Sequence, residues 1–282
     1  MTERTITIQR EADRVSVEAH LLPEPPRDRD SGIPLADLQS PGRVMFEDLV
    51  FAEPLLVRMR QLTDEVALWP ELDRVGVPRR NRVLLHGPPG CGKTSVAAAF
   101  ATELGLPLAV SRVDSLMSSY LGETAANMRA LFEFAADVPC VLLLDEFDSV
   151  GKLRADPSDH GELRRVVNSI LQLIETYAGP STVMAATNSP EILDAALWRR
   201  FDAVLELPLP TREQLQHLLA KQLPEFSAGV LHAVTDDLRG LPHAAAAATA
   251  QATRRSAIRA GRAPEAVDLY AAVAEVTSRP WT

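Results

Sequence analysis

A glycine-rich stretch that begins at Gly87 carries the residue types that bind phosphate. Its sequence, GPPGCGKTS, follows the strand-like residues RVLLH and runs directly into SVAAAFATELG, which favours a helix closed by Gly105. In the pattern G-x-x-x-x-G-K-T, glycines let backbone N–H groups turn towards phosphates, and the next helix adds its positive N-terminal dipole. Lys93 then reaches the β- and γ-phosphates, and the Thr94 hydroxyl binds Mg²⁺. The residues predicted to contact nucleotide here are Gly87, Pro88, Pro89, Gly90, Cys91, Gly92, Lys93, Thr94 and Ser95.

Two adjacent carboxylates follow a second apolar run. The residues VLLLDEFDS form a buried-strand pattern that ends in Asp145 and Glu146. Asp145 suits a position at the Mg²⁺ ion, either as a direct ligand beside Thr94 or through an intervening ligand. Glu146 suits the general base that orients and deprotonates an attacking water. Acidic residues also commonly begin loops after strands, but together with the lysine loop this pair predicts an ATP site.

The elements that would position these side chains alternate between strand and helix. From Phe46 to Pro208, apolar runs alternate with helical patterns, which is the signature of a parallel sheet covered by helices. The predicted strands are Arg82–His86, Leu106–Val110, Cys140–Leu144, Thr182–Ala186 and Ala203–Leu207. Helical spacing recurs in two sets between them, Ala125, Met128, Phe132 and Ala135, and Leu163, Val166, Val167, Ile170, Leu171 and Ile174.

Three regions are predicted along the chain. Residues 1–45 are an N-terminal segment whose proline-rich part, Pro23–Gly42, is interpreted as a linker or an extended arm. Residues 46–208 form the α/β nucleotide-binding domain. The remaining residues, 209–282, are predicted to be helical, with Thr211 as an N-cap, an alanine-rich stretch at Ala244–Ala252 and a last amphipathic stretch over Pro264–Val276.

Composition limits the classes of function. The chain has 282 residues, a formal net charge of −9 and a sequence pI near 5.2. It therefore has no overall attraction to nucleic-acid backbones or anionic lipids. Cys91 and Cys140 are its only cysteines, which argues against a disulfide framework and fits a reducing compartment. The N-terminal residues lack a signal-peptide core, and no apolar run approaches the roughly 18 residues of a membrane span. We therefore expect a cytoplasmic location.

Taken together, these motifs resemble the AAA+ ATPases, in the clade of proteasomal, membrane-fusion and microtubule-severing ATPases, as a short bacterial-type member. Besides GPPGCGKT and LLLDEFDS, the resemblance is carried by SSYLGET, HGELRRVVNSILQLI and MAATNSPEILDAALWRRFD, and it extends from Phe46 to the C-terminus. It implies a P-loop NTPase fold, a parallel sheet sandwiched by helices, followed by a small all-helical lid domain. It also implies ATP and Mg²⁺ as cofactors, hydrolysis to ADP and phosphate, and a homo-oligomer, most simply a hexamer.

The resemblance assigns roles to three further polar residues. Asn188, in the ATN triplet, is expected to contact the γ-phosphate or the attacking water, since an amide donates and accepts without altering the charge. Arg199 is expected to be the arginine finger that reaches a neighbouring subunit's nucleotide, with Arg200 in support. The family usually separates these arginines by two residues including a glycine, and ALWRRFD lacks that spacer. Without the resemblance, a double arginine is more often a solvated salt-bridge pair.

Two segments on the expected adenine side of the site depart from the commonest patterns. In FEDLVF, Phe51 replaces a common glycine, so adenine contacts at this segment are no more than suspected. In GLPHAAAAA no second sensor arginine appears, an absence that matches this clade. His243 lies where the lid approaches the ribose or adenine, although a solvated histidine at a helix start is an equally good interpretation.

An aromatic residue indicates what ATP hydrolysis would drive. Tyr120, Leu121 and Gly122 fall between the second predicted strand and the next helix, where related hexamers place a loop in a central pore. An aromatic and an aliphatic side chain can grip any polypeptide by apolar contact, and Gly122 would give the loop freedom to move. Arg154–Glu162 would be the second pore-facing loop. The alternative is that Tyr120 packs beneath its own surface loop.

The combined prediction is a motor that unfolds, remodels or threads protein substrates with a separately encoded effector, such as a protease. Two alternatives stay open. The first is an accessory AAA+ ATPase that acts on nucleic-acid machinery, against which the acidic pI and Tyr120 argue. The second is a nucleotide-dependent switch or assembly subunit that lacks threading activity.

Overall fold

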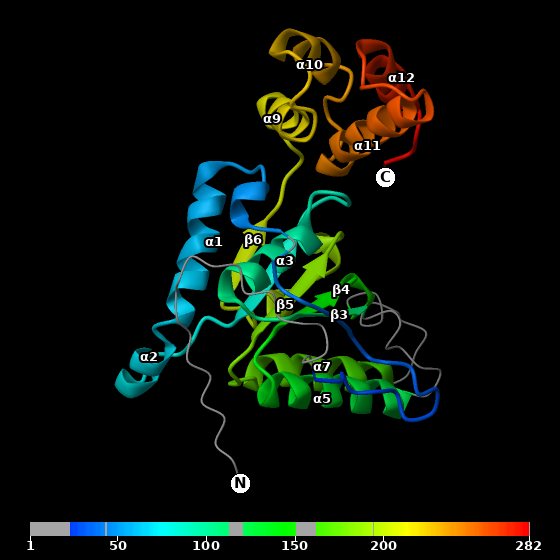
Figure 1. The fold of residues 1–282 in the computed structure, drawn as a ribbon. Helices are drawn as coiled ribbons and strands as arrows, with labels where there is room; N and C mark the ends of the chain where they lie inside the picture. The colour runs from blue at the N-terminus through cyan, green and yellow to red at the C-terminus, as the bar shows by residue number, and fades with distance from the viewer. Residues whose placement is uncertain (1–22, 43, 113–120, 151–161, 194, 282) are drawn as a thin grey trace.

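The computed structural model describes residues 23–42, 44–112, 121–150, 162–193 and 195–281. These residues form a sheet with helices on both faces, followed by a separate group of helices near the C-terminus (Figure 1). The helices that accompany the sheet are α1 (Glu53–Val66), α2 (Trp69–Val75), α3 (Lys93–Leu104), α5 (Leu121–Asp137), α7 (Glu162–Thr176) and α8 (Ala195–Trp198), with 3-10 turns at η2 (Phe46–Asp48) and η3 (Pro190–Ile192).

The six strands lie in the order β1-β3-β4-β5-β2-β6. They are β1 (Asp37–Gln39), β2 (Arg82–His86), β3 (Leu108–Arg112), β4 (Val141–Asp145), β5 (Thr182–Thr187) and β6 (Ala203–Glu206). Every pair among β2 to β6 is parallel, so the carboxyl ends of these strands meet at one edge of the sheet. The central strands are buried on both faces, which explains their continuous apolar sequences. The predicted α/β architecture is confirmed.

All five predicted strands are present, but two begin later than predicted. β3 starts at Leu108 rather than Leu106, because the Leu106 N–H donates to Ala101 O (2.9 Å) and closes the end of α3. Pro107 then contributes only its carbonyl, which accepts from Val141 N (2.9 Å) at the start of β4. The shift carries β3 on to Arg112, beyond the predicted end of the strand.

Of the two interpretations of Pro23–Gly42, a linker or an extended arm, the linker is wrong for the second half of the segment. β1 pairs antiparallel with β3, with Asp37 opposite Val110 and Gln39 opposite Leu108. The preceding residues Leu35 and Ala36 are buried in the core, and the Ser111 hydroxyl donates to Leu35 O (2.7 Å). The sheet therefore has one antiparallel edge strand, supplied by residues that the sequence analysis placed outside the nucleotide-binding domain.

Two apolar layers cover the two faces of the sheet. α5 and α7 pack against one face and α1 and α3 against the other (Figure 1). Alternate residues of each strand point to opposite layers: Leu142 and Leu144 join the α5–α7 layer, while Val141 and Leu143 join the α1–α3 layer. The predicted helical spacing in α7 is confirmed by the burial of Val166, Val167, Ile170, Leu171 and Ile174.

A third apolar cluster holds the C-terminal helices together. These are α9 (Arg212–Gln222), α10 (Ala228–Thr235), α11 (His243–Arg259) and α12 (Ala266–Thr277). The predicted N-cap is confirmed, since Gln214 N donates to the Thr211 hydroxyl (3.3 Å) and Thr211 N donates to Gln214 Oε1 (2.8 Å). The alanines of α11 let α9 and α12 pack closely against it. The domain boundaries at residues 45 and 208 stay predictions.

Candidate functional site

The loop between β2 and α3 has a backbone that requires glycine at several positions. Gly90 (φ +72°) and Gly92 (φ +89°) lie in the left-handed region. Gly87 is constrained by space, because a Cβ there would lie 2.1 Å from the backbone oxygen of Leu207, the residue that follows β6. By helix geometry, the first N–H groups of α3 have no carbonyl of their own helix to bind, and they are suited to an anion.

Lys93 is the first residue of α3, and its side chain turns back into this loop. The residue is only 7% exposed, and Nζ donates to Gly87 O (2.7 Å) and Pro88 O (3.0 Å). Burial lowers the pKa of Lys93, and the negative charges of its neighbours, including Asp145, oppose that shift only in part. A buried ammonium that is held by neutral carbonyls would gain from an anionic partner.

Thr94 and Asp145 are brought together from α3 and the end of β4. The Thr94 hydroxyl donates to Asp145 Oδ2 over 3.3 Å. Within the described parts of the chain, no group of three or more His, Cys, Asp or Glu side chains could hold a metal by itself. Mg²⁺ is commonly bound by one or two carboxylates together with substrate phosphates and water, so a hydroxyl and a carboxylate suit an ion that arrives with a nucleotide.

Glu146 has an unusual backbone conformation. Its φ is +55°, and no other non-glycine residue among those described has a positive φ. The conformation is held from both sides, because Glu146 N donates to Asp145 Oδ1 (2.9 Å) and Phe147 N donates to Ala186 O (2.8 Å). Such backbone strain is typical of functional positions. The Glu146 side chain is about 41% exposed and lies 3.3 Å from the Arg112 guanidinium.

Arg112 is a site residue that the sequence analysis missed. It is the last residue of β3 and stands opposite Asp145 in the parallel register of β3 and β4. Its NH2 group donates to both carboxylate oxygens of Glu146 at 3.3 Å. The predicted strand ended at Val110, so Arg112 was not recognised as lying at the same edge of the sheet as the two carboxylates.

One cavity of about 630 Å³ contains most of the predicted nucleotide residues. Asn188, which follows β5 directly, lines it and is exposed. Gly87 and Pro88 are absent from its lining but contact Lys93 through their carbonyls. The other predicted residues that line it are Pro89, Gly90, Cys91, Gly92, Lys93, Thr94, Ser95, Asp145 and Glu146.

The far end of the cavity is closed by the first turn of α11. His243 Nε2 lies 2.9 Å from Val50 O, so Nε2 carries the hydrogen, and the His243 ring packs against Phe51 at 5.1 Å. The neighbouring Ala244 N donates to Gly90 O (3.0 Å). His243 Nδ1 is buried and has no partner among the described residues, and burial lowers the pKa of His243. His243 is therefore not a solvated helix-start histidine.

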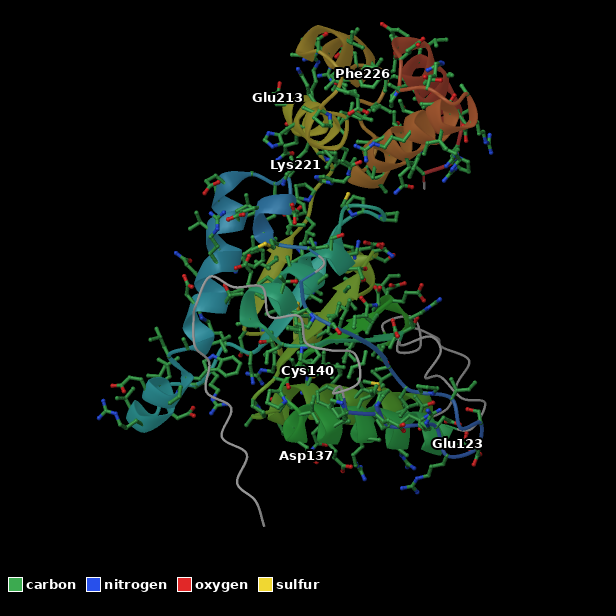
Figure 2. The ribbon with its side chains drawn as sticks, viewed as in Figure 1. Glu123, Asp137, Cys140, Glu213, Lys221 and Phe226 are labelled. Carbon is green, nitrogen blue, oxygen red and sulfur yellow. The ribbon has the colours of Figure 1, made fainter. Side chains whose placement is uncertain are left out.

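A second contact ties the C-terminal helices to the same segment. Lys221, near the end of α9, lies on the side of these helices that faces the sheet (Figure 2). Its Nζ donates to Glu47 O and lies 3.3 Å from Asp48 Oδ1. The segment Glu47–Phe51 is thus held by α9 and by α11, and both helices contribute residues to the cavity.

The two predicted finger residues lie away from this cavity. Arg199 is exposed, and it makes no hydrogen bond or ion pair with any residue that the structure describes. Arg200 pairs with Glu175 of α7. Neither lines the cavity of its own chain. Their assignment to a neighbouring subunit stays a prediction.

The predicted pore loop is only partly described. Tyr120 lies outside the described residues. Leu121 and Gly122 belong to the first turn of α5 and not to a loop, which corrects the prediction, because the helical segment begins earlier than expected. Of the predicted second loop, residues 154–161 lie outside the described residues, and Glu162 begins α7.

Comparisons with known proteins find a family and several relatives to which this chain is similar. The family described as "ATPase family associated with various cellular activities (AAA)" matches residues 83–209. An uncharacterized AAA family ATPase, y4kL, of Sinorhizobium fredii (strain NBRC 101917 / NGR234) is 46% identical over 172 residues, which are 61% of this chain and 52% of that protein. A proteasome-activating nucleotidase of Thermococcus gammatolerans is 35% identical over 194 residues, 66% of this chain and 49% of that one.

The likeness extends to a solved structure. The crystal structure of the FIGL-1 AAA domain superposes with a TM-score of 0.69 at 24% sequence identity, covering 86% of each chain, and so supports the fold. The present chain spans about half the length of the curated relatives that it matches. Among its described helices, none has the length and apolar character needed to cross a membrane.

Proposed function

We propose that this chain, whose residues 83–209 match the AAA family of ATPases, binds ATP beside Lys93 and hydrolyses it to ADP and phosphate. The proposal is carried by one observation, the convergence of a buried lysine, a hydroxyl–carboxylate pair and a strained glutamate at one cavity. All of them come from the carboxyl edge of the parallel strands, where open α/β sheets bind ligands.

Lys93 supplies positive charge for the phosphates. A phosphate oxygen that replaces the Gly87 or Pro88 carbonyl would give Nζ an anionic partner in a buried place. Because burial lowers the pKa of Lys93, the bound anion would also favour its protonated form. Thr94 and Asp145 would hold Mg²⁺, which when bound neutralises charge on the phosphate oxygens.

Glu146 has the chemistry and the exposure of a general base. Its carboxylate faces the cavity from the turn after β4 and could accept a proton from a water beside the γ-phosphate. Arg112 donates to both oxygens of that carboxylate, each of which has a further lone pair that can accept from a water. Asn188 would orient the water or the γ-phosphate by hydrogen bonds that leave the charge of the site unchanged.

Two variants separate binding from chemistry. Glu146→Gln should retain ATP binding and lose turnover by about 10²- to 10⁴-fold, because only the proton acceptor is removed. Lys93→Ala should lose binding itself. Fluorescent-nucleotide titration and phosphate release measure the two effects, and Glu133→Gln, on the exposed side of α5, is the matched control. Near-normal turnover by Glu146→Gln, or equal ATP affinity in both variants, contradicts the assignment.

We extend the proposal to protein substrates, on which a ring of identical subunits would act. The Thermococcus relative is named for activating a proteasome, which supports a motor that serves a separately encoded proteolytic effector. Tyr120 is the residue that we propose to grip the substrate. An apolar ring can hold a polypeptide without reading its sequence.

Tyr120 provides the test of this extension. Tyr120→Ala should hydrolyse ATP within a few-fold of the unaltered chain but fail to unfold a tagged fluorescent client. Tyr120→Phe should retain unfolding, because the ring and not the hydroxyl makes the contact. Normal client unfolding by Tyr120→Ala rejects the extension while leaving the ATPase proposal intact. Turnover stimulated by DNA or RNA, and not by the client, would instead favour a role on nucleic-acid machinery.

A further inference from the structure

The adjacent arginines after α8 have different surroundings. Arg199 is exposed, and no partner for it is found in the described chain. The Arg200 side chain is 26% exposed, and its guanidinium donates to the Glu175 carboxylate and to Leu171 O (3.4 Å), both on α7. The Arg200 Nε is buried without a partner, which places the base of the guanidinium inside the protein. The Arg200 guanidinium is therefore bound to helix α7 of its own chain.

The two residues that follow are also held. Phe201 is buried, and its ring meets Phe147 edge to face, with centroids 5.9 Å apart. Asp202 makes a two-way contact with Arg82 at the start of β2: Arg82 N and Nε donate to Asp202 Oδ2 (3.0 and 2.8 Å), and Asp202 N donates to Arg82 O (2.9 Å).

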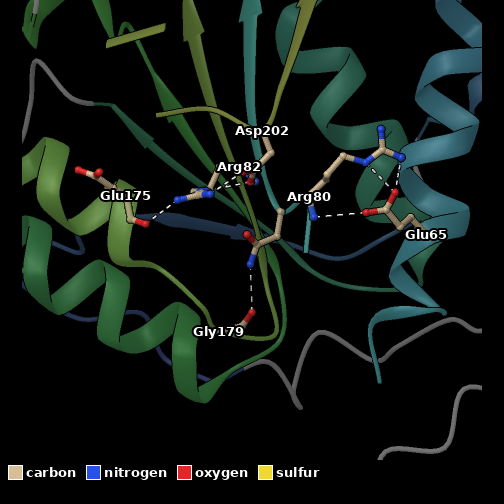
Figure 3. Close-up of polar contacts among 7 residues, drawn as sticks. Glu65, Arg80, Arg82, Glu175, Gly179 and Asp202 are labelled. Atoms are coloured by element: carbon tan, nitrogen blue, oxygen red, sulfur yellow. Dashed lines mark hydrogen bonds and ion pairs between the residues drawn. The ribbon is translucent and has the colours of Figure 1, made fainter. Parts of the chain in front are cut away.

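Arg82 joins these contacts into one network. Its guanidinium lies between Asp202 and Glu175 and donates to the Glu175 backbone carbonyl as well (Figure 3). The Arg82 and Asp202 side chains are mostly buried, and their hydrogen bonds raise the pKa of Arg82. Glu175 thus accepts from Arg200 at its carboxylate and from Arg82 at its carbonyl. The chain that follows Arg199 is fixed to α7 and β2 at once.

We infer that Arg199 alone reaches a neighbouring subunit, and that Arg200, Asp202 and Arg82 are positioning residues that fix the backbone from which Arg199 projects. The inference rests on the proposed ATP hydrolysis and on the expectation that Arg199 acts on a neighbouring subunit's nucleotide. Turn hydrogen bonds from Arg200 N to Leu197 O (3.1 Å) and from Phe201 N to Trp198 O (3.3 Å) make the chain helical at this point. Neighbouring side chains on a turn with such three-residue hydrogen bonds point about 120° apart, so the two adjacent arginines leave the backbone in different directions.

A fixed base matters because a finger acts by preorganised charge. An arginine side chain has many rotamers, and its effect on the transition state depends on where its backbone holds it. Releasing Arg200 towards a neighbour would break its charge-assisted hydrogen bonds with Glu175 and leave its buried part without compensation. The network therefore positions the exposed guanidinium of Arg199. Arg200 does not act as a second finger.

The test exchanges the charges of the Arg200–Glu175 pair in the full chain. Arg200→Glu should lower kcat at least about 10-fold while leaving the KM for ATP within about 3-fold, since the cavity is untouched. Combining it with Glu175→Arg should restore kcat to within about 3-fold, because the ion pair is remade in reverse. A finger cannot be rescued in this way. A folded exchange variant that stays as inactive as Arg200→Glu overturns the inference. Arg165→Glu, on the exposed side of α7, is the matched control.

Two milder variants keep the inference testable if Arg200→Glu does not fold. Glu175→Gln removes a partner that only a positioning arginine needs, so kcat should fall several-fold at unchanged KM; unaltered kcat overturns the inference. Arg200→Lys keeps the ion pair and should keep most activity, whereas loss as large as that of Arg199→Ala would make Arg200 a finger after all. Arg199→Ala with normal turnover would instead reject the expected role of Arg199 as a finger, whatever the exchange shows, and would leave the proposed ATP hydrolysis intact.

Discussion

Charged side chains near the two ends of strand β2 have different surroundings. Beyond its carboxyl end, Lys93 is buried with only carbonyls around Nζ, and Glu146 is half-exposed on a strained backbone. At its amino end, Arg82 donates to the Asp202 carboxylate from both its backbone N–H and its guanidinium. The guanidinium of the nearby Arg80 donates to Glu65 (Figure 3). One strand therefore separates a buried cation that is hydrogen-bonded to neutral carbonyls from cations that are paired with carboxylates.

The difference indicates which charges are available for a ligand. A charge that already has a desolvated, hydrogen-bonded partner stabilises the fold, and removing either member leaves the other uncompensated. A charge held by neutral groups gains most when a ligand of opposite sign arrives. We therefore expect changes at the carboxyl end of β2 to affect turnover, and changes at the amino end to affect stability and the placement of Arg199.

The largest effect is expected from the exposed cation itself. Arg199→Ala should lower turnover by about 10³-fold, since a finger stabilises transition-state charge, while leaving ATP affinity unchanged. Mixing Arg199→Ala with Lys93→Ala subunits should recover part of the activity, because some interfaces then combine an intact finger with an intact cavity. Phosphate release from mixed oligomers measures this. No recovery, or full activity from a strict monomer, would contradict action in trans.

The next effect tests the paired end. Asp202→Ala leaves the Arg82 guanidinium largely buried with only the Glu175 carbonyl, and should reduce the free energy of unfolding by about 2 kcal/mol. ATP affinity should be unchanged. Asp137→Ala, exposed at the end of α5, should change stability by less than about 0.5 kcal/mol. Denaturant unfolding compares the two, and equal stabilities would remove the contrast between the ends of β2.

A smaller effect, of opposite sign, is expected at the cavity. Glu146→Gly should increase the free energy of unfolding by about 1 kcal/mol, because glycine adopts a positive φ without strain. Glu133→Gly on α5 should lower it by about 1 kcal/mol, as glycine does inside a helix. Turnover should vanish in the first variant alone. Destabilisation by Glu146→Gly would mean that the Glu146 side chain stabilises the fold, as the Arg82–Asp202 pair does at the amino end of β2.

The smallest effect concerns pH. Burial lowers the pKa of His243 in the folded chain, so below its ordinary value of 6.5 the unfolded chain binds the extra proton first. Stability should therefore fall as pH drops below 6.5, by less than about 1.4 kcal/mol per unit. His243→Gln, which keeps a donor for Val50 O, should show a shallower fall between pH 7 and 5.5 than the unaltered chain. His217→Gln, exposed on α9, is the control, and identical pH profiles for all three would refute the assignment.

The sequence predicted best what depends on local pattern. The strands β2, β4 and β5 stand in the middle of the sheet, and burial on both faces makes them apolar throughout. The N-cap at Thr211 is likewise local. By contrast, β1 has only three residues and no apolar run, and it is a strand only because the edge of β3 is there to pair with it.

The contacts between charged residues could not be predicted in the same way. Arg112 meets Glu146 only because β3 and β4 are parallel neighbours in register. Arg200 meets Glu175 only because α7 packs beside the turn after α8. Both pairs join residues that are far apart in the chain, and strand order and helix packing, not residue type, bring them together. Residue types alone therefore indicated the cavity but not what surrounds Arg199.

The close packing of Gly87 against Leu207 restricts how this chain can change by mutation. Any side chain at position 87 would place a carbon atom 2.1 Å from a main-chain oxygen of the next segment, so a substitution is blocked before phosphate binding is considered. β6 lies at the edge of the sheet and pairs with β2, and the burial of its alternate residues fixes its register. A mutation that moves β6 and Leu207 would therefore need a compensating change in the phosphate loop. We expect the sequences of these two segments to change together during evolution.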